Sequence, residues 1–214
     1  MREYVIFDFD GTIVQSKMLA IRLFNELAAK YGGRQIEEAE IPRLSGLSIP
    51  DRLKALQVPL YKMPPLVLEG KRRYRDELPG LQPAPGMREV FARLKNHGYK
   101  LGILSSNTMD NIQTFLAQHE LAGFDFVHSS TNMFGKDKAI RKMARSAGFG
   151  LDQMIYVGDE LRDVQACRKV DVPIIAVTWG LDSAKLLAQA GPDYLCHSAA
   201  ELEAIILAGS GKRG

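Results

Sequence analysis

The sequence has few cysteines, no long apolar run and no large excess of either charge. Two cysteines among 214 residues, Cys167 and Cys196, make no disulfide framework and have no zinc-ligand spacing around them, so both are expected to be small buried residues. The longest apolar stretches, such as 4–7 and 174–177, are far too short to span a bilayer. Two aspartates within the first ten residues exclude an apolar signal segment, so we expect a cytoplasmic protein without a membrane partner.

The charge is nearly balanced overall but unevenly distributed. The formal net charge of +3 is too small to indicate a nucleic-acid partner. Residues 14–82 contain 12 Lys and Arg against 8 Asp and Glu, so the positive excess lies in this interval. With 46% hydrophobic residues, the chain has enough apolar material for a core in one or two domains.

Short apolar segments alternate with helical patterns over most of the chain. Continuous apolar runs are typical of strands that are buried on both faces of a parallel sheet. Strands are expected at 3–7, 100–104, 124–127, 154–157, 173–177 and, as a short edge strand, 194–195. Helices are expected at 87–96, 109–119, 138–147, 163–169, 183–190 and 199–207. This alternation predicts an α/β fold, with a doubly wound parallel sheet covered by helices on both faces.

The interval 14–82 breaks this alternation. It contains no convincing strand, and it ends in LPGLQPAPG, a Pro- and Gly-rich sequence that is typical of a turn or linker. Its helical patterns lie at 16–31, 36–44, 50–56 and 65–78. We therefore expect a helical domain of residues 14–82, inserted after the first strand of a core domain that consists of residues 1–13 and 83–214.

Acidic residues follow two of the expected strands directly. Asp8 and Asp10 belong to the sequence DFDGT, and Asp159 and Asp163 belong to GDELRD. Because ligands of parallel α/β sheets bind at the carboxyl ends of the strands, we expect the four carboxylates at one edge. An Asp-Gly turn or helix capping by Asp would explain either cluster alone. Together they favour a hard cation, and Mg²⁺ with few protein oxygens and a substrate phosphate fits better than a caged Ca²⁺.

Hydroxyl and amino groups follow two further strands. Ser105 and Ser106 lie between a strand and a helix, where hydroxyl and backbone N–H groups can bind phosphate. Lys136 follows Gly135 ahead of a helix, and Lys138 is close enough to take the same role. Alone, the serines are typical of a turn and the lysine of a solvated surface. Their shared position at strand ends makes them candidates for a phosphate site.

These four motifs stand in the order and spacing of the haloacid dehalogenase superfamily, which the sequence resembles from the first strand to about Ala176. The insertion resembles the helical cap of that family. The overall pattern, with the sequence TWG at 178–180, is most similar to its phosphoglycolate phosphatase-like branch. The resemblance implies a Rossmann-like core and a phosphatase that uses Mg²⁺ and an aspartyl-phosphate to hydrolyse a small anionic phosphorylated metabolite.

The resemblance also implies roles for individual residues. Asp8 would be the nucleophile, and Asp10 would protonate the leaving oxygen and later deprotonate the attacking water. The metal would be held by Asp8, the backbone carbonyl of Asp10, Asp159 and, in support, Asp163. The phosphoryl oxygens would be bound by backbone N–H groups near Gly11 and by Ser105, Ser106 and Lys136.

A sugar phosphomutase with the same motifs is the main alternative to a phosphatase. Mutases of the family tend to carry a basic residue just after a Gly-containing cap loop, where this chain has Ile49, and they often replace the residue that is Thr12 here. Arg43 and Arg52 flank this loop and are candidates for reading the substrate. A non-catalytic binding protein is disfavoured because both catalytic aspartates are present. Phosphoglycolate, sugar phosphates and nucleotides all remain candidate substrates.

Overall fold

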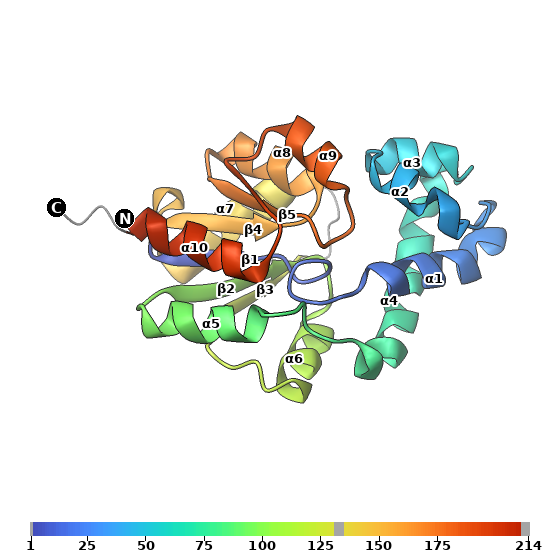
Figure 1. Cartoon of the computed structure of the whole chain (residues 1–214). Coiled ribbons are helices and arrows are strands. Elements are labelled where there is room, and N and C mark those ends of the chain that lie inside the picture. The colour runs from blue at the N-terminus through green and yellow to red at the C-terminus, as the bar shows by residue number, and fades with distance from the viewer. Residues whose placement is uncertain (1, 131–134, 211–214) are drawn as a thin grey trace.

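Six parallel strands form a sheet with the spatial order β3-β2-β1-β4-β5-β6 in the computed structural model, which describes residues 2–130 and 135–210 (Figure 1). The strands are β1 Tyr4–Phe7, β2 Lys100–Ser105, β3 Phe124–Ser129, β4 Met154–Gly158, β5 Ile174–Val177 and β6 Tyr194–Cys196. Each expected strand is present, and its ends lie within two residues of those expected. The predicted doubly wound α/β fold is confirmed.

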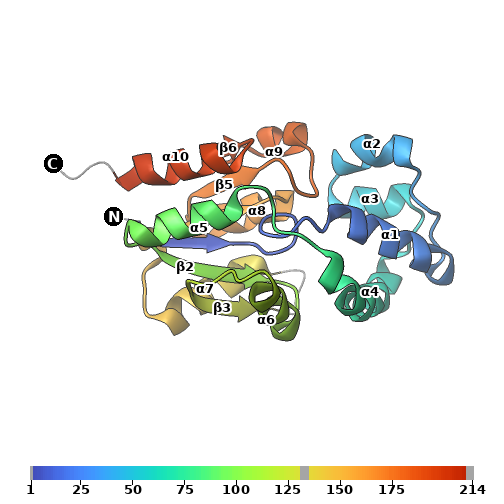
Figure 2. The same cartoon turned by 60° about the horizontal axis from the view of Figure 1, so that its bottom comes forward.

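Alternate residues of each strand contribute to opposite faces of the sheet. On β1, Val5 and Phe7 belong to one apolar cluster and Ile6 belongs to the other. Helices cover both faces of the sheet (Figures 1 and 2), which explains why the strands are continuously apolar. One face carries α5 Met87–Asn96, α6 Met109–Gln118 and α10 Ala199–Ser210, and the other carries α7 Lys136–Ala147, α8 Leu161–Val170 and α9 Ala184–Ala190.

The strand order reverses beside β1, at the centre of the sheet. This strand pairs with β2 on one side and β4 on the other, and Phe7 aligns with Ile103 and Val157. The chain builds outward to β3 on the first side and then starts again with β4. In open α/β sheets, ligands bind beyond the carboxyl ends of the strands at such a reversal. The residues that follow β1 and β4 are therefore placed to form a site.

The helices between β1 and α5 gather beyond the carboxyl ends of the strands (Figures 1 and 2). They are α1 Lys17–Ala28, α2 Ile41–Ser45, α3 Ile49–Ala55 and α4 Met63–Glu77. The helix expected at 36–44 is shorter than predicted, because Glu38–Glu40 forms a 3₁₀ turn and α2 starts at Ile41. Pro42 has no amide hydrogen to donate and is accommodated only in the first turn of an α-helix.

The inserted helices bury their apolar residues in two places. The tip of the insertion has a cluster of its own, formed by Leu44, Leu53, Leu56, Val58 and Met63. The stem, formed by α1, the end of α4 and the 3₁₀ turn Leu78–Gly80 that follows it, packs into the larger cluster of the sheet through Leu19, Leu23, Tyr74 and Leu78. The amide of Gln15 donates to the carbonyl of Gln82 at 2.9 Å, so the entering and leaving connections are paired. The apolar residues of the stem therefore belong to the same cluster as those of the sheet, whereas the apolar residues of the tip form a separate cluster.

The structure bears on two further features, the two cysteines and the shortness of the apolar runs. Cys167 and Cys196 are both buried and free, as expected for small apolar residues. Burial raises the pKa of the Cys196 thiol to about 11, so it is protonated at neutral pH. Within the described ranges, no helix combines the length and the apolar character needed to cross a membrane.

Candidate active site

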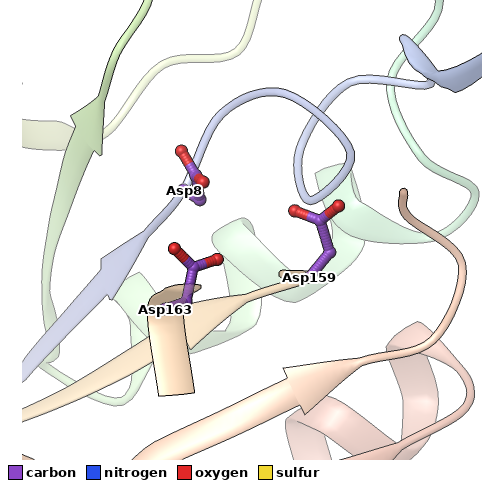
Figure 3. Close-up of side chains that lie close together, drawn as sticks. All are labelled: Asp8, Asp159 and Asp163. Atoms are coloured by element: carbon purple, nitrogen blue, oxygen red, sulfur yellow. The ribbon is translucent and has the colours of Figure 1, made fainter. Parts of the chain in front are cut away.

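Three buried aspartates meet beyond the ends of β1 and β4 (Figure 3). Asp8 follows β1, Asp159 follows β4, and Asp163 lies in the first turn of α8. Each offers a carboxylate oxygen, and these oxygens all lie within 4.8 Å of one another. The three residues are at most 2% exposed. The sheet topology thus brings together three of the four aspartates that the sequence singles out.

The three carboxylates carry more negative charge than Lys136, which bonds to two of them, can offset. Burial raises the pKa of Asp8 to about 6, with Lys136 opposing the rise and Asp163 adding to it. Burial, together with Glu160 and Asp8, also raises the pKa of Asp159 well above its usual range. A hard divalent cation would supply the missing charge, and carboxylate oxygens are the ligands it prefers. The oxygens of Asp8, Asp159 and Asp163 therefore fit Mg²⁺.

Lys136 bridges two of the three aspartates. Its Nζ donates to Oδ2 of Asp8 at 2.6 Å and to Oδ1 of Asp163. Burial would lower the pKa of Lys136, but the charges of Asp163 and Asp8 outweigh it and raise that pKa. Helix α7 begins at Lys136, two residues earlier than expected, and Lys138 is exposed. Of the two candidate lysines, Lys136 is the one that the structure places at the carboxylates.

Asp10 lies apart from this cluster and is held between the core and the insertion. Its Oδ1 accepts a hydrogen bond from the Tyr74 hydroxyl of α4 at 2.6 Å, and its Oδ2 accepts one from Asn107 Nδ2 at 3.0 Å. Burial and the charge of Asp10 raise the pKa of Tyr74, so the hydroxyl stays a donor. Sequence reasoning missed both partners, because Tyr74 sits in the charged run KRRYR and Asn107 in a Ser/Asn turn.

The orientation of Asp159 is fixed by two segments that are far apart in the sequence. Thr12 Oγ1 donates to its Oδ1 at 3.0 Å, and the amide of Leu181 donates to its Oδ2 at 2.7 Å. Trp179 Nε1 in turn donates to the carbonyl of Thr12 at 3.0 Å. The TWG segment therefore supports the loop after β1 as well as contributing to the site, a role that the motif alone did not indicate.

Gly11 makes room for Asp159. Its φ of +75° favours glycine, and an added Cβ would stand 2.2 Å from Asp159 Oδ2. The family resemblance implies that backbone N–H groups near Gly11 bind phosphate. In the structure, the Gly11 amide donates to the carbonyl of Val14 at 3.0 Å and to Ser16 Oγ at 3.1 Å. Gly11 thus serves the close approach of Asp159, and its own amide is engaged within the loop.

The candidate phosphate contacts come together at the end of β2. Ser105 is 2% exposed, and its Oγ accepts a hydrogen bond from the Asn107 amide at 3.0 Å. Ser105, Ser106 and Lys136 line a small recess together with Arg162, a cation that the sequence analysis did not single out. Arg162 Nε donates to Glu160 Oε1 at 2.9 Å. Its lining therefore combines hydroxyl groups and positive charge, which are donors to phosphoryl oxygens, although the recess itself, about 10 Å³, has room for no more than about one water molecule.

The two arginines that were expected to read the substrate both have protein partners in the structure. Arg43 is exposed and pairs with Glu40 at 2.8 Å within the insertion. Arg52 Nη2 donates to Asp182 Oδ1 at 2.6 Å, in the loop after β5. The other oxygen of Asp182 accepts the amide of Leu161 at 2.7 Å, at the start of α8. Arg52 thus fastens the tip of the insertion to the core through a contact across 130 residues.

Arg52→Ala should lower stability and leave substrate preference unchanged. The side chains of Arg52 and Asp182 are 14% and 3% exposed, and removing one partner of such a buried pair costs roughly 3 kcal/mol. Urea unfolding would measure this loss, and kcat/KM for two unlike substrates should change in parallel. Arg43→Ala, in an exposed pair, should cost less than about 1 kcal/mol. A rise in KM for one substrate alone, at unchanged stability, would support the substrate-reading role and contradict this expectation.

Comparison with known proteins identifies the family. Residues 5–177 match the haloacid dehalogenase-like hydrolase family. The chain belongs to this family. It is 34% identical over 199 residues to a phosphoglycolate phosphatase from Synechococcus elongatus, covering 92% of this chain and 94% of the relative. It is also 22% identical over 211 residues to pyrophosphatase PpaX from Bacillus mycoides, covering 94% and 95% of the two chains.

Solved structures show the same fold. The crystal structure of a predicted phosphatase from Clostridium acetobutylicum superposes with a TM-score of 0.81, covering 97% of this chain and 99% of that chain at 24% identity. The family, the fold and the enzyme class expected from the sequence are therefore confirmed, and the chain is a phosphatase-type hydrolase. Because the relatives carry different substrate names, the substrate has to be inferred from the site.

Proposed function

We propose that the protein is a Mg²⁺-dependent phosphatase that hydrolyses a small phosphate monoester through an aspartyl-phosphate on Asp8. The observation that carries this proposal is the juxtaposition of Asp8, Asp159 and Asp163 at the strand-order reversal, with Lys136 bonded to two of them. The name of the Synechococcus relative makes phosphoglycolate one candidate substrate, and a sugar phosphate is another.

The first half of the reaction requires Asp8 to attack phosphorus. Its Oδ1 accepts the Phe9 amide at 2.7 Å, and its Oδ2 accepts Lys136, so the carboxylate is held in one orientation. Attack forms a bond from Asp8 to phosphorus and breaks the bond to the leaving oxygen. Ser105, Ser106 and Lys136 would bind the remaining phosphoryl oxygens. Mg²⁺, held by the three clustered aspartates and the Asp10 carbonyl, would supply charge that offsets the repulsion between the carboxylate and the phosphate.

Asp10 would carry the protons in both halves of the reaction. It would protonate the leaving oxygen as the ester bond breaks, and then take a proton from the water that hydrolyses the aspartyl-phosphate. Its carboxylate is separate from the clustered aspartates, and Tyr74 and Asn107 fix it from two sides. Such a group can exchange a proton without giving up a metal contact.

We propose that residues 14–82 act as a cap domain on a core of residues 1–13 and 83–214. Three contacts from the insertion to the core support this division of labour: the hydroxyl of Tyr74 bonds to Asp10, the amine of Lys71 bonds to the Ser106 carbonyl, and Arg52 pairs with Asp182. Two of these contacts reach residues of the proposed reaction site. The insertion would therefore shield the chemistry from water and bound the space for the leaving group.

Tyr74→Phe should slow the esters whose leaving groups need a proton. The change keeps the ring, which packs in the core, and removes the hydroxyl that orients Asp10. We expect kcat for an alkyl phosphate to fall roughly tenfold, and kcat for p-nitrophenyl phosphate to fall less, because nitrophenolate leaves without protonation. Tyr61→Phe is the control, because Tyr61 is 77% exposed. Equal losses for both esters would argue against a role of Tyr74 in proton transfer.

The acceptor of the phosphoryl group separates a phosphatase from a phosphomutase. We expect rapid Mg²⁺-dependent release of phosphate from simple monoesters, with one solvent oxygen in each phosphate released and no activation by sugar bisphosphates. Ile49, at the position where mutases tend to be basic, and Arg52, already paired with Asp182, support this choice. Many isomerisations of a sugar phosphate for each phosphate released would identify a mutase instead.

A further inference from the structure

A pocket of about 290 Å³ opens beside Asp10, between α1 and α4 of the insertion. This volume is close to the lower end of pockets that hold small ligands, roughly 300–1,000 Å³. The polar end of the pocket is formed by Asp10, Ser16, Lys71, Tyr74, Ser106 and Asn107. The walls beyond are formed by Ala20, Leu23, Phe24, Leu27, Leu66 and Val67, together with Gly70. The pocket therefore changes from polar to apolar as it extends away from Asp10.

The polar groups at the Asp10 end are engaged with one another. Tyr74 and Asn107 donate to Asp10, and Ser16 Oγ accepts the amide of Gly11. The described residues on the walls beyond carry no hydrogen-bonding side chain. A sugar hydroxyl placed there would lose its bonds to water and gain none in return, which is unfavourable. A hydrocarbon group would gain by leaving water.

Lys71 is the only cation among the described residues that line this pocket. Its amine is partly buried and donates to the carbonyl of Ser106, one residue after Ser105. Burial lowers the pKa of Lys71, and the nearby charge of Asp10 opposes this effect. An ammonium group with one neutral carbonyl partner retains donors for an anion, and its position beside Asp10 would place that anion near the ester oxygen.

We propose that this pocket binds the leaving group, and that it selects phosphate esters of short hydroxy acids that carry a hydrocarbon body. The hydrocarbon would lie between α1 and α4, and the carboxylate would pair with Lys71. This inference rests on the proposed phosphatase function and narrows its substrate class. It predicts a higher kcat/KM for esters with a branched alkyl group than for phosphoglycolate, which has the carboxylate alone. It also predicts a higher kcat/KM for these esters than for sugar phosphates.

Four esters separate the two recognition elements. Methyl phosphate has neither element, phosphoglycolate has the carboxylate, 3-methylbutyl phosphate has the alkyl group, and 2-phosphooxy-4-methylpentanoate has both. We expect each element to raise kcat/KM by roughly tenfold or more, since a few buried methylenes and one charge-assisted bond are each worth that much. Ribose 5-phosphate should rank below the alkyl esters. The inference is overturned if the alkyl group gives no gain or if ribose 5-phosphate is preferred.

Two substitutions test the two elements separately. Gly70→Leu should remove most of the gain from the alkyl group. Beyond its chain neighbours and the adjacent helix backbone, a Cβ at this position would meet no atom within 4 Å, and Gly70 lines the pocket, so the new side chain can occupy it. Lys71→Met should remove the gain from the carboxylate. The controls are Gly209→Leu, an equally open position on α10, and Arg72→Met, an exposed cation one residue from Lys71. Loss of the same gains in a control variant would contradict the assignment.

Binding without turnover separates this inference from the proposed function. With Mg²⁺ present, 3-methylbutylphosphonate should bind roughly tenfold more tightly than methylphosphonate, and Gly70→Leu should abolish the difference. If no ester is hydrolysed but this difference holds, the proposed function fails and the pocket assignment stands. If esters are hydrolysed but both phosphonates bind alike, the phosphatase stands and the inference is overturned.

Discussion

Asp8→Asn is expected to lower phosphate release by roughly a thousandfold or more, while the protein stays folded. The amide has almost the shape of the carboxylate and can still accept the Phe9 amide hydrogen, but it is not a competent nucleophile towards phosphorus. Lys136 keeps its bond to Asp163, so the buried ammonium group is not left without a partner. Turnover of p-nitrophenyl phosphate and the circular dichroism spectrum would measure the two parts of this expectation.

The matched control for Asp8→Asn is Asp152→Asn, which removes a carboxylate from an exposed position beside β4. It should leave turnover within about twofold of the parent, because surface substitutions away from a site have small effects. Near-normal phosphate release by a folded Asp8→Asn variant would contradict the mechanism. An unfolded variant would point to a structural role for Asp8, and Asp8→Glu, which retains the charge but displaces it, would then serve as the second test of catalysis.

The core of the site was predictable because strand ends in a parallel sheet have fixed relative positions. Phe7 aligns with Val157, so the residues that follow β1 and β4 must be neighbours whichever side chains they carry. Asp8 and Asp159 each follow an apolar run. The residue type therefore indicates a carboxylate, and the preceding run indicates that it lies at the end of a strand. The short interval between Asp159 and Asp163 then places the Asp163 carboxylate in the first turn of α8.

The contacts of the insertion were not predictable from local patterns. Tyr74 reaches Asp10 across 64 residues, and Arg52 reaches Asp182 across 130. The position of a helical domain on the core depends on which residues of the two surfaces pack together. The hydrophobic period of a helix or a strand carries no information about such pairs. Arg43 and Arg52 both flank a loop, and that position alone does not distinguish an arginine that faces a substrate from one that faces a carboxylate of the protein.

A usable signal was nevertheless present in α4. The spacing of Val67, Gly70, Lys71 and Tyr74 places them on one face of a helix, whereas the exposed Arg72 and Arg73 lie on another. The run KRRYR therefore combines a solvated face with a face turned to the site, and its average composition conceals the difference. The tight fit at Gly11 had no such signal, because it depends on the distant side chain of Asp159.

Removal of divalent metal should abolish turnover, and Mg²⁺ should restore it. The Asp8, Asp159 and Asp163 carboxylates repel one another, and without a cation the charge of Asp8 also opposes the approach of a phosphate. Ca²⁺ should not substitute, since it prefers more ligands at longer distances. Full activity after exhaustive treatment with EDTA would contradict the proposed role of these aspartates, provided that the metal content is verified by mass spectrometry.

The pH dependence of Mg²⁺ binding provides a sharper test of the same site. The folded, metal-free protein raises the pKa of Asp8 from 3.8 to about 6, so it holds this proton more tightly than the unfolded chain does. The contribution of Asp8 to stability should therefore fall as the pH rises from about 4 to about 6, and added Mg²⁺ should stabilise the protein most above pH 6. Below pH 6 the metal must displace the proton, so the Mg²⁺ concentration for half-saturation should rise roughly tenfold between pH 7 and pH 5. Calorimetric titration at several pH values would measure this rise together with the protons released. A half-saturating concentration that is the same at pH 5 and pH 7 would mean that Asp8 does not bind the metal.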